Sequence, residues 1–149
     1  MSFISYAQNN EDVMLWRIFK HIEKGFYIDV GANDPMMDSV TKAFYDLGWS
    51  GINIEPLGTH YTDLSNERPR DINLQCAVGA TEGQVDLFEF DIRGWATTSA
   101  HIADRYKSLG HPIIKHKVVM LPLSHICAEH VTSEIHFLKI DVEGSEKSV

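Results

Sequence analysis

Two short apolar segments, each followed by a residue that ends strands, flank an amphipathic stretch near the start of the sequence. The first segment spans 26–30 and is followed by Gly31, and the second spans 51–55 and is followed by Pro56. Between them, apolar residues recur at i, i+3, i+4 and i+7 over 40–47, which is the spacing of one buried helical face. Short apolar runs suit buried parallel strands, which right-handed crossovers join through a helix. The pattern therefore predicts an α/β fold built around a parallel sheet.

The segment before the first strand predicts a helix over 11–23. Asn9 or Asn10 is expected to cap its start, and Gly25 is expected to end it. The residues of the expected buried face are Leu15, Ile18, Phe19 and Ile22.

The elements after the second strand continue the alternation. We expect a helix at 60–66, a third strand at 72–78, a strand at 85–90, a loop and short helix within 94–110, a strand at 117–121, a helix at 124–130 and a fourth parallel strand at 135–141. The strands 85–90 and 117–121 are expected to pair as an antiparallel hairpin. The parallel strands are predicted to lie in the order 3-2-1-4, with helices on both faces.

The composition fits a single domain over 1–149, with an N-terminal helical segment at 1–25 and a core at 26–149. The chain has 149 residues, of which 44% are hydrophobic, and this is enough for one sizeable core. No apolar stretch reaches the ~18 residues that a membrane span needs. The net charge of −8 argues against nucleic acid as a main partner, because phosphate contacts need clustered Lys and Arg.

The two cysteines indicate a protein in a reducing environment. Cys76 and Cys127 lie among apolar neighbours and have no C-x-x-C partner. Buried free thiols in a cytoplasmic protein are favoured over a disulfide or a zinc site. The eight histidines show no metal-ligand spacing, so no metal site is predicted.

Residues 141–146 predict a turn from the fourth parallel strand into a helix, yet the chain ends three residues later. A helix of one turn would cover no face of the sheet. We therefore expect a fragment of a longer domain, truncated on its C-terminal side. The edge of the fourth strand should be unpaired or should pair with another chain, for example in a homodimer.

The ends of the first two strands carry the features of a ligand site. Gly31 follows the first strand, where the strand carboxyl ends leave a crevice and a glycine lets backbone and ligand approach closely; a plain turn is the alternative. The pyrophosphate fingerprint G-x-G-x-x-G is absent, which disfavours NAD. Glu55 ends the second strand, where an acid can accept hydrogen bonds from both ribose hydroxyls, although a lone Glu there is often only solvated. One glycine turn and one acid suit a nucleoside ligand that has no pyrophosphate, and S-adenosylmethionine is such a ligand.

Two further carboxylates follow the fourth parallel strand. Asp141 and Glu143 could orient an acceptor hydroxyl or take its proton; alternatively, Asp141 caps a helix and Glu143 faces water. Lys139, inside the apolar strand, is expected to pair with a carboxylate or to reach solvent rather than to react.

Taken together, these segments resemble the FkbM-type methyltransferases, which are S-adenosylmethionine-dependent enzymes that mostly methylate hydroxyl oxygens. The resemblance rests on blocks in the family's order, among them Y-I-D-V-G-A-N-D, G-I-N-I-E-P and F-L-K-I-D-V-E-G-S-E. The full set of blocks is 5–12, 27–34, 39–41, 51–56, 77–79 and 137–146. The resemblance implies the Rossmann-like sheet of class I methyltransferases, continuing beyond residue 146.

The resemblance also implies roles for individual residues. The implied cofactor contacts are Asp29, Gly31 and Asn33 at the methionine end, Ser39 at the following helix start, Glu55 at the ribose, and Ala77 and Val78 at the adenine. Asp141 and Glu143 would face the transferring methyl group, and the segment 8–12 would lie over the pocket.

The function implied is O-methylation of a sugar hydroxyl in a glycan or a glycosylated metabolite. The oxygen would attack the sulfonium methyl in line, with a carboxylate assisting deprotonation. Two alternatives stay open at this point: an enzyme that binds NAD or a nucleotide sugar on the same sheet, and a non-catalytic fragment.

Overall fold

The computed structural model describes residues 3–144 and 146–149. Its centre is a parallel sheet in the order β3-β2-β1-β7. The strands are β1 (Phe26–Val30), β2 (Ser50–Ile54), β3 (Ile72–Leu74) and β7 (Phe137–Ile140). This confirms the predicted order and places the first strand inside the sheet. Residues 1–2 of the expected helical segment and Ser145 of the 137–146 block lie outside the described residues.

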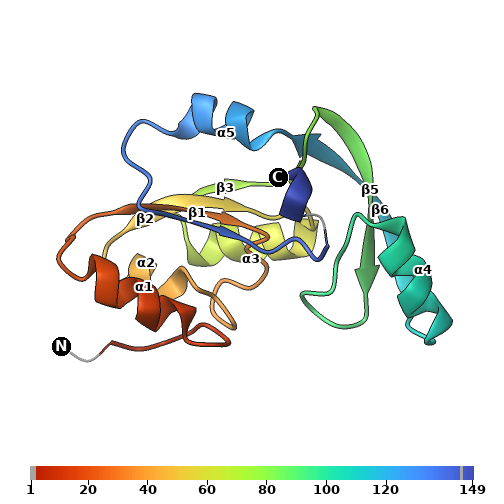
Figure 1. Ribbon diagram of the computed structural model, residues 1–149, viewed down its shortest axis with the longest axis horizontal. Helices are drawn as coiled ribbons and strands as arrows, with labels where there is room; N and C mark the ends of the chain where they lie inside the picture. Colours follow the sequence, from red (N-terminus) through yellow and green to blue (C-terminus); the bar gives the residue numbers. More distant parts are fainter. Residues whose placement is uncertain (1–2, 145) are drawn as a thin grey trace.

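A second sheet lies at one end of the first (Figure 1) and has the order β4-β6-β5. Its strands are β4 (Ala77–Val78), β5 (Gly83–Phe90) and β6 (Ile113–Leu121). β5 and β6 pair antiparallel along their length, as predicted, and β4 pairs parallel with the end of β6.

The prediction of one strand over 72–78 was wrong, because this segment changes sheets. The last hydrogen bond between β2 and β3 runs from the Glu55 amide to the Leu74 carbonyl, at 3.0 Å. The next amide on this side of the strand, that of Leu57, donates to the Glu55 Oε1 at 2.9 Å instead of continuing the ladder. The chain then turns at 75–76, and Ala77 pairs with Met120 of β6 instead.

The helices cover both faces of the parallel sheet, with α5 on one side and α1, α2 and α3 on the other (Figure 1). Their bounds are α1 (Glu11–Phe19), α2 (Lys42–Asp46), α3 (Gly58–Glu67), α4 (Ala100–Ser108), α5 (Leu123–His130) and a final 3-10 turn, η1 (Glu146–Ser148). Among the described residues, no helix is long and apolar enough to cross a membrane.

The first helix differs from its prediction in three ways. It ends at Phe19 rather than at 23, Ile18 is 61% exposed, and Asn10 makes no side-chain capping bond. The buried Asp12 carboxylate instead ties the preceding segment to the helix start, since it accepts hydrogen bonds from the Ser5 hydroxyl and the Tyr6 amide, both at 2.7 Å, and from the Val13 amide at 2.8 Å.

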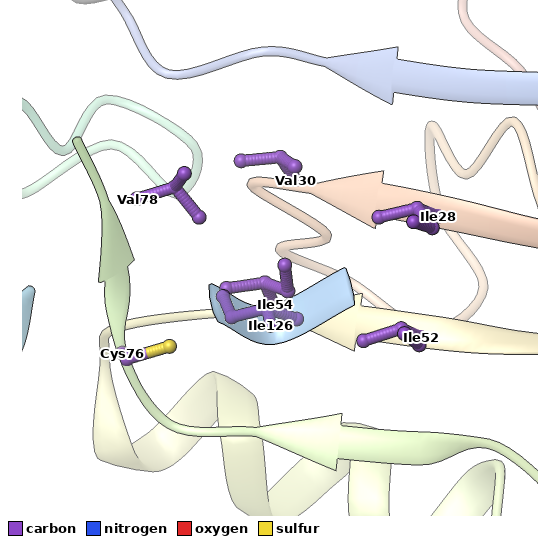
Figure 2. Packing of buried hydrophobic residues seen from close by; sticks show 7 residues of the cluster. All are labelled: Ile28, Val30, Ile52, Ile54, Cys76, Val78 and Ile126. Carbon is purple, nitrogen blue, oxygen red and sulfur yellow. The ribbon is translucent and has the colours of Figure 1, made fainter. Parts of the chain in front are cut away.

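The core consists of two clusters, one on each face of the parallel sheet, because neighbouring strand residues point to opposite faces. On the α5 face lies an aliphatic cluster (Figure 2) of Ile28, Val30, Ile52, Ile54, Cys76, Val78 and Ile126. On the other face lies an aromatic cluster of Tyr27, Phe44 and Trp49, against which Phe137 packs. The aliphatic cluster contains residues of both sheets, so the two sheets share one core.

Both cysteines are free, as expected. Cys76 belongs to the aliphatic cluster, and burial raises the pKa of its thiol to about 11. A thiol in such a surrounding is unreactive.

The outer edge of β7 is unpaired within the described part of the chain.

Candidate active site

A cavity of about 210 Å³ lies at the carboxyl ends of β1, β2 and β7. Residues of the loop between β5 and α4 form its other wall, so both sheets contribute to it. Strand carboxyl ends in open α/β sheets are the usual place for a ligand.

Most of the residues predicted for the site line this cavity. They are Gly31, Asn33, Glu55, Ala77, Val78, Asp141 and Glu143. Gln8, from the segment expected over the pocket, lines it as well.

Gly31 allows the loops after β1 and β7 to meet. Its φ is +74°, and a Cβ there would lie 1.9 Å from the carbonyl oxygen of Asp141. Its amide and that of Ala32 donate to the Ile54 carbonyl, which fixes the turn against β2. A side chain at this position would therefore disturb the backbone as well as the cavity.

Glu55 is held by the backbone on both sides. Its Oε2 accepts from the Asn33 amide and its Oε1 from the Leu57 amide, both at 2.9 Å. Burial raises the pKa of this carboxyl group. Because a carboxylate oxygen can accept more than one hydrogen bond, Glu55 keeps acceptor capacity toward the cavity.

Asp29 lies beneath the turn rather than at the cavity wall. The Thr41 hydroxyl donates to its Oδ2 at 2.8 Å, and the Lys139 Nζ lies 3.0 Å from its Oδ1. Lys139 also donates to the Gly31 carbonyl at 2.6 Å, so the expected pairing of this lysine with a carboxylate is confirmed. Lys139, the ion-pair partner of Asp29, itself lines the cavity wall.

Ser39 is buried away from the cavity. Its hydroxyl accepts from the guanidinium of Arg68, which also donates to the Thr41 hydroxyl and to the Pro35 carbonyl. Arg68 is itself buried and fixes the path of residues 35–41. Nothing in the local sequence around Arg68 indicated this role.

The two carboxylates after β7 differ in their surroundings. The Asp141 side chain is 61% exposed and lies 4.0 Å from the Lys139 Nζ. Burial raises the pKa of Glu143, and the charges of Asp141 and Glu146 add to this effect. A raised pKa makes a carboxylate a stronger base.

The loop after β5 supplies residues that the sequence did not single out. Arg93 binds Asp34 and Asp63, each at 3.2 Å, and so ties this loop to the β1 loop and to α3. Trp95 lines the cavity and packs on Tyr106 with ring centroids 5.0 Å apart. Burial, and secondarily the charge of Arg93, lowers the pKa of His60 in the same wall. Only the polar stretch between the hairpin strands could have indicated Arg93 and Trp95.

Comparison with known families decides the class of the protein. The sequence model described as "Methyltransferase FkbM domain" matches residues 29–149. The chain belongs to the FkbM methyltransferase family. No match was found among curated proteins or among solved structures. The match begins within β1, at Asp29, and covers the other strands of both sheets and most residues of the cavity, whereas α1 and Gln8, which also lines the cavity, precede it. Membership favours methyl transfer over the NAD and nucleotide-sugar alternatives.

Proposed function

We propose that this FkbM methyltransferase uses S-adenosylmethionine to methylate a sugar hydroxyl of a glycan or a glycosylated metabolite. The observation that carries the proposal is the meeting of the Gly31 turn, Glu55 and the Asp141–Glu143 carboxylates in one cavity. When bound, the cofactor supplies an electrophilic methyl group on a sulfonium centre.

The residues of the cavity fit such a cofactor. Within the described residues, the Oδ1 of Asn33 is buried and has no hydrogen-bond partner, and Asn33 lines the cavity. A buried polar atom without a partner is costly, and an ammonium group is a donor that would satisfy it. Gly31 and Asn33 would thus hold the methionine end, Glu55 the ribose, and Ala77 with Val78 the adenine.

The acceptor would lie between the loop after β5 and the loop after β7. Trp95 offers an aromatic face there, and Asp141 and Glu143 offer acceptors for hydroxyl protons. A sugar ring presents both C–H surface and hydroxyls, which suits an aromatic ring next to carboxylates. Holding the two reactants in line would supply most of the acceleration, and proton transfer to a carboxylate about 10²–10⁴-fold more.

Calorimetry tests the cofactor. We expect S-adenosylhomocysteine to bind and NAD not to bind, and we expect Asn33→Ala to weaken binding by about ten-fold, the effect of one hydrogen bond with a charged partner. Asn66→Ala, on the exposed face of α3, is the matched control and should bind normally. Binding of NAD but not of S-adenosylhomocysteine would contradict the proposed cofactor. Equal affinity of Asn33→Ala and Asn66→Ala for S-adenosylhomocysteine would show that Asn33 is not part of the cofactor site.

Transfer of a labelled methyl group tests the acceptor class. We expect label from S-adenosylmethionine to appear on methyl glycosides or oligosaccharides in a form that resists mild alkali, as an ether does. Label released by alkali would indicate a carboxyl ester and would contradict a hydroxyl acceptor.

A further inference from the structure

Thr97 joins the second sheet to the loop after β7. Its side chain is buried, with the residue 1% exposed. Its backbone forms a two-way bridge with Phe88 of β5, with hydrogen bonds of 2.9 and 3.0 Å. Its hydroxyl donates to the Glu143 carbonyl at 2.8 Å and accepts from the Ser99 amide at 3.1 Å. The hydroxyl is therefore used in both directions and is anchored on a rigid strand.

The loop that Thr97 contacts has an unusual backbone. Glu143 has a φ of +48° and Gly144 a φ of +93°, so two successive residues lie in the left-handed region. This region is unfavourable for a residue with a Cβ, and it persists only where the surroundings impose it. The contacts of the loop with the second sheet and α4 are what impose it here.

Helix α4 closes on the same loop. A Cβ at Gly144 would lie 2.4 Å from the Cδ1 of Ile102, and the φ of +93° there favours glycine, so the loop passes close to this helix. Ser99 caps α4 by accepting from the Ile102 amide. Thr97 and α4 thus contact two consecutive residues of the loop after β7, Glu143 and Gly144.

We propose that Thr97 is a positioning residue of the methyl-transfer site, whose hydroxyl holds the Glu143 carbonyl and thereby keeps the Glu143 carboxyl group at the cavity wall. The proposal rests on the proposed function for the role of Glu143. In this arrangement the second sheet, which bears the acceptor wall, also sets the carboxylate that faces the acceptor.

The titration of Glu143 tests the proposal. Carboxyl carbons labelled with ¹³C at glutamate report each pKa by NMR, and Glu143→Gln identifies the signal. In Thr97→Val the loop loses its hydrogen bond, so the Glu143 carboxyl group should be free to move away from the charges of Asp141 and Glu146, and its pKa should fall toward the usual glutamate value. Thr97→Ser keeps the hydroxyl and should restore the titration of the unaltered protein. An unchanged titration in Thr97→Val would overturn the proposal.

Ser99→Ala is the matched control. It disturbs the same turn and the cap of α4 but leaves the hydroxyl of Thr97 on Glu143, so it should not move the Glu143 titration. An equal shift in Ser99→Ala would show that the turn as a whole, rather than the Thr97 hydroxyl, positions the loop, and would also overturn the proposal.

A measurement on the unaltered protein is independent of how the variants fold. The Thr97 hydroxyl proton should exchange slowly with water and give cross-peaks to backbone protons of residues 143–144. If these cross-peaks are absent even at low temperature, where exchange with water is slowest, the hydrogen bond between Thr97 and Glu143 is contradicted.

Calorimetry separates this proposal from the proposed function. S-adenosylhomocysteine should bind Thr97→Val within about three-fold of the unaltered protein, because less than 1 kcal/mol is at stake at a distance from the cofactor residues. Failure of the unaltered protein to bind would defeat the proposed function, while the titration would still decide the role of Thr97. A loss of binding confined to Thr97→Val would overturn the positioning of Glu143 alone.

Discussion

Glu55 shows how one side chain can support the backbone and line the cavity at the same time. Its two oxygens join the loop after β1 to the loop after β2 through the amides of Asn33 and Leu57, and the same carboxyl group lines the cavity. Removing it therefore has two separable effects, one on folding and one on binding.

We expect Glu55→Ala to lower the free energy of unfolding by about 1–3 kcal/mol for each buried amide left without an acceptor. On the folded protein it should also weaken S-adenosylhomocysteine binding by about 1.5–3 kcal/mol, the range for bonds to a charged group. Urea titration and calorimetry measure the two effects. Glu129→Ala, an exposed change on α5, should alter neither. Full affinity in folded Glu55→Ala would remove Glu55 from the cofactor site.

His60 gives a pH dependence with a definite sign. Burial, with a further effect of Arg93, lowers its pKa in the folded protein below the ordinary value of 6.5. As the pH falls, the unfolded chain therefore takes up the proton first, so the stability that neutral His60 provides is full above pH 6.5 and is lost below it. We expect the unaltered protein to lose stability relative to His60→Gln between about pH 7 and pH 5. Parallel urea midpoints for the two proteins across this range would contradict the shift.

The sequence predicted which residues line the cavity more accurately for residues that directly follow a strand than for residues inside a strand or for residues that make contacts distant in the sequence. Gly31, Glu55 and Asp141 are marked by the end of an apolar run, and all three line the cavity. Asp29 is inside its strand, where alternation turns it to the face of Tyr27 and Thr41. Arg68 and Thr97 act across 27 and 46 positions of the chain, and no local spacing reports contacts of that kind.

At the scale of elements, the order of the parallel strands was predictable and the change of sheet was not. Helical and strand spacings alternate through the chain, and short right-handed crossovers then leave few possible orders. The apolar run 72–78, however, continues without a break in the sequence. On the neighbouring strand, the next amide that would face this run, that of Leu57, donates to the Glu55 carboxylate instead, and no local pattern in 72–78 reports this.

Strands β1 and β7 are tied by a charged pair as well as by their ladder. Asp29 and Lys139 are direct neighbours in register, and their charged groups lie 3.0 Å apart with Asp29 almost fully buried. We expect Lys139→Met to destabilise the fold by about 3–5 kcal/mol, because a buried carboxylate is left without its partner.

The double variant Asp29→Asn with Lys139→Met should recover much of this loss. An asparagine can still accept from Thr41 but carries no charge that needs a partner. Urea unfolding of the two single variants and the double variant gives the coupling energy. Simple additivity of the two losses would show that the pair contributes nothing beyond its separate contacts.

At the scale of the whole molecule, we propose that residues 1–149 form one domain. Cys76 and Val78, which lie in the second sheet or at its entrance, belong to the same cluster as Ile28 and Ile54 of the first sheet. Shared burial of this kind makes partial unfolding costly, because opening either sheet exposes the other.

Native-state hydrogen exchange tests this unity. Amides of β1 and of the end of β6 near Leu121, which packs on the shared cluster, should exchange only through global unfolding, with the same dependence on urea. The far end of the hairpin, where Phe90 contacts Tyr106 at 5.1 Å, should open locally at lower free energy. A smaller urea dependence for the end of β6 than for β1 would indicate two separately unfolding units.

The change of sheet also has a consequence for diversification. The segment 79–120 leaves and rejoins the rest of the molecule at neighbouring points, since Val78 pairs with Leu121 and the Gly79 amide donates to the Leu121 carbonyl at 3.2 Å. A stretch with adjacent ends can be lengthened, shortened or transplanted at small entropic cost. We expect that exchanging this stretch between homologous enzymes would alter the part of the cavity wall that residues 93–98 form, while the Gly31 turn and Glu55 keep their places.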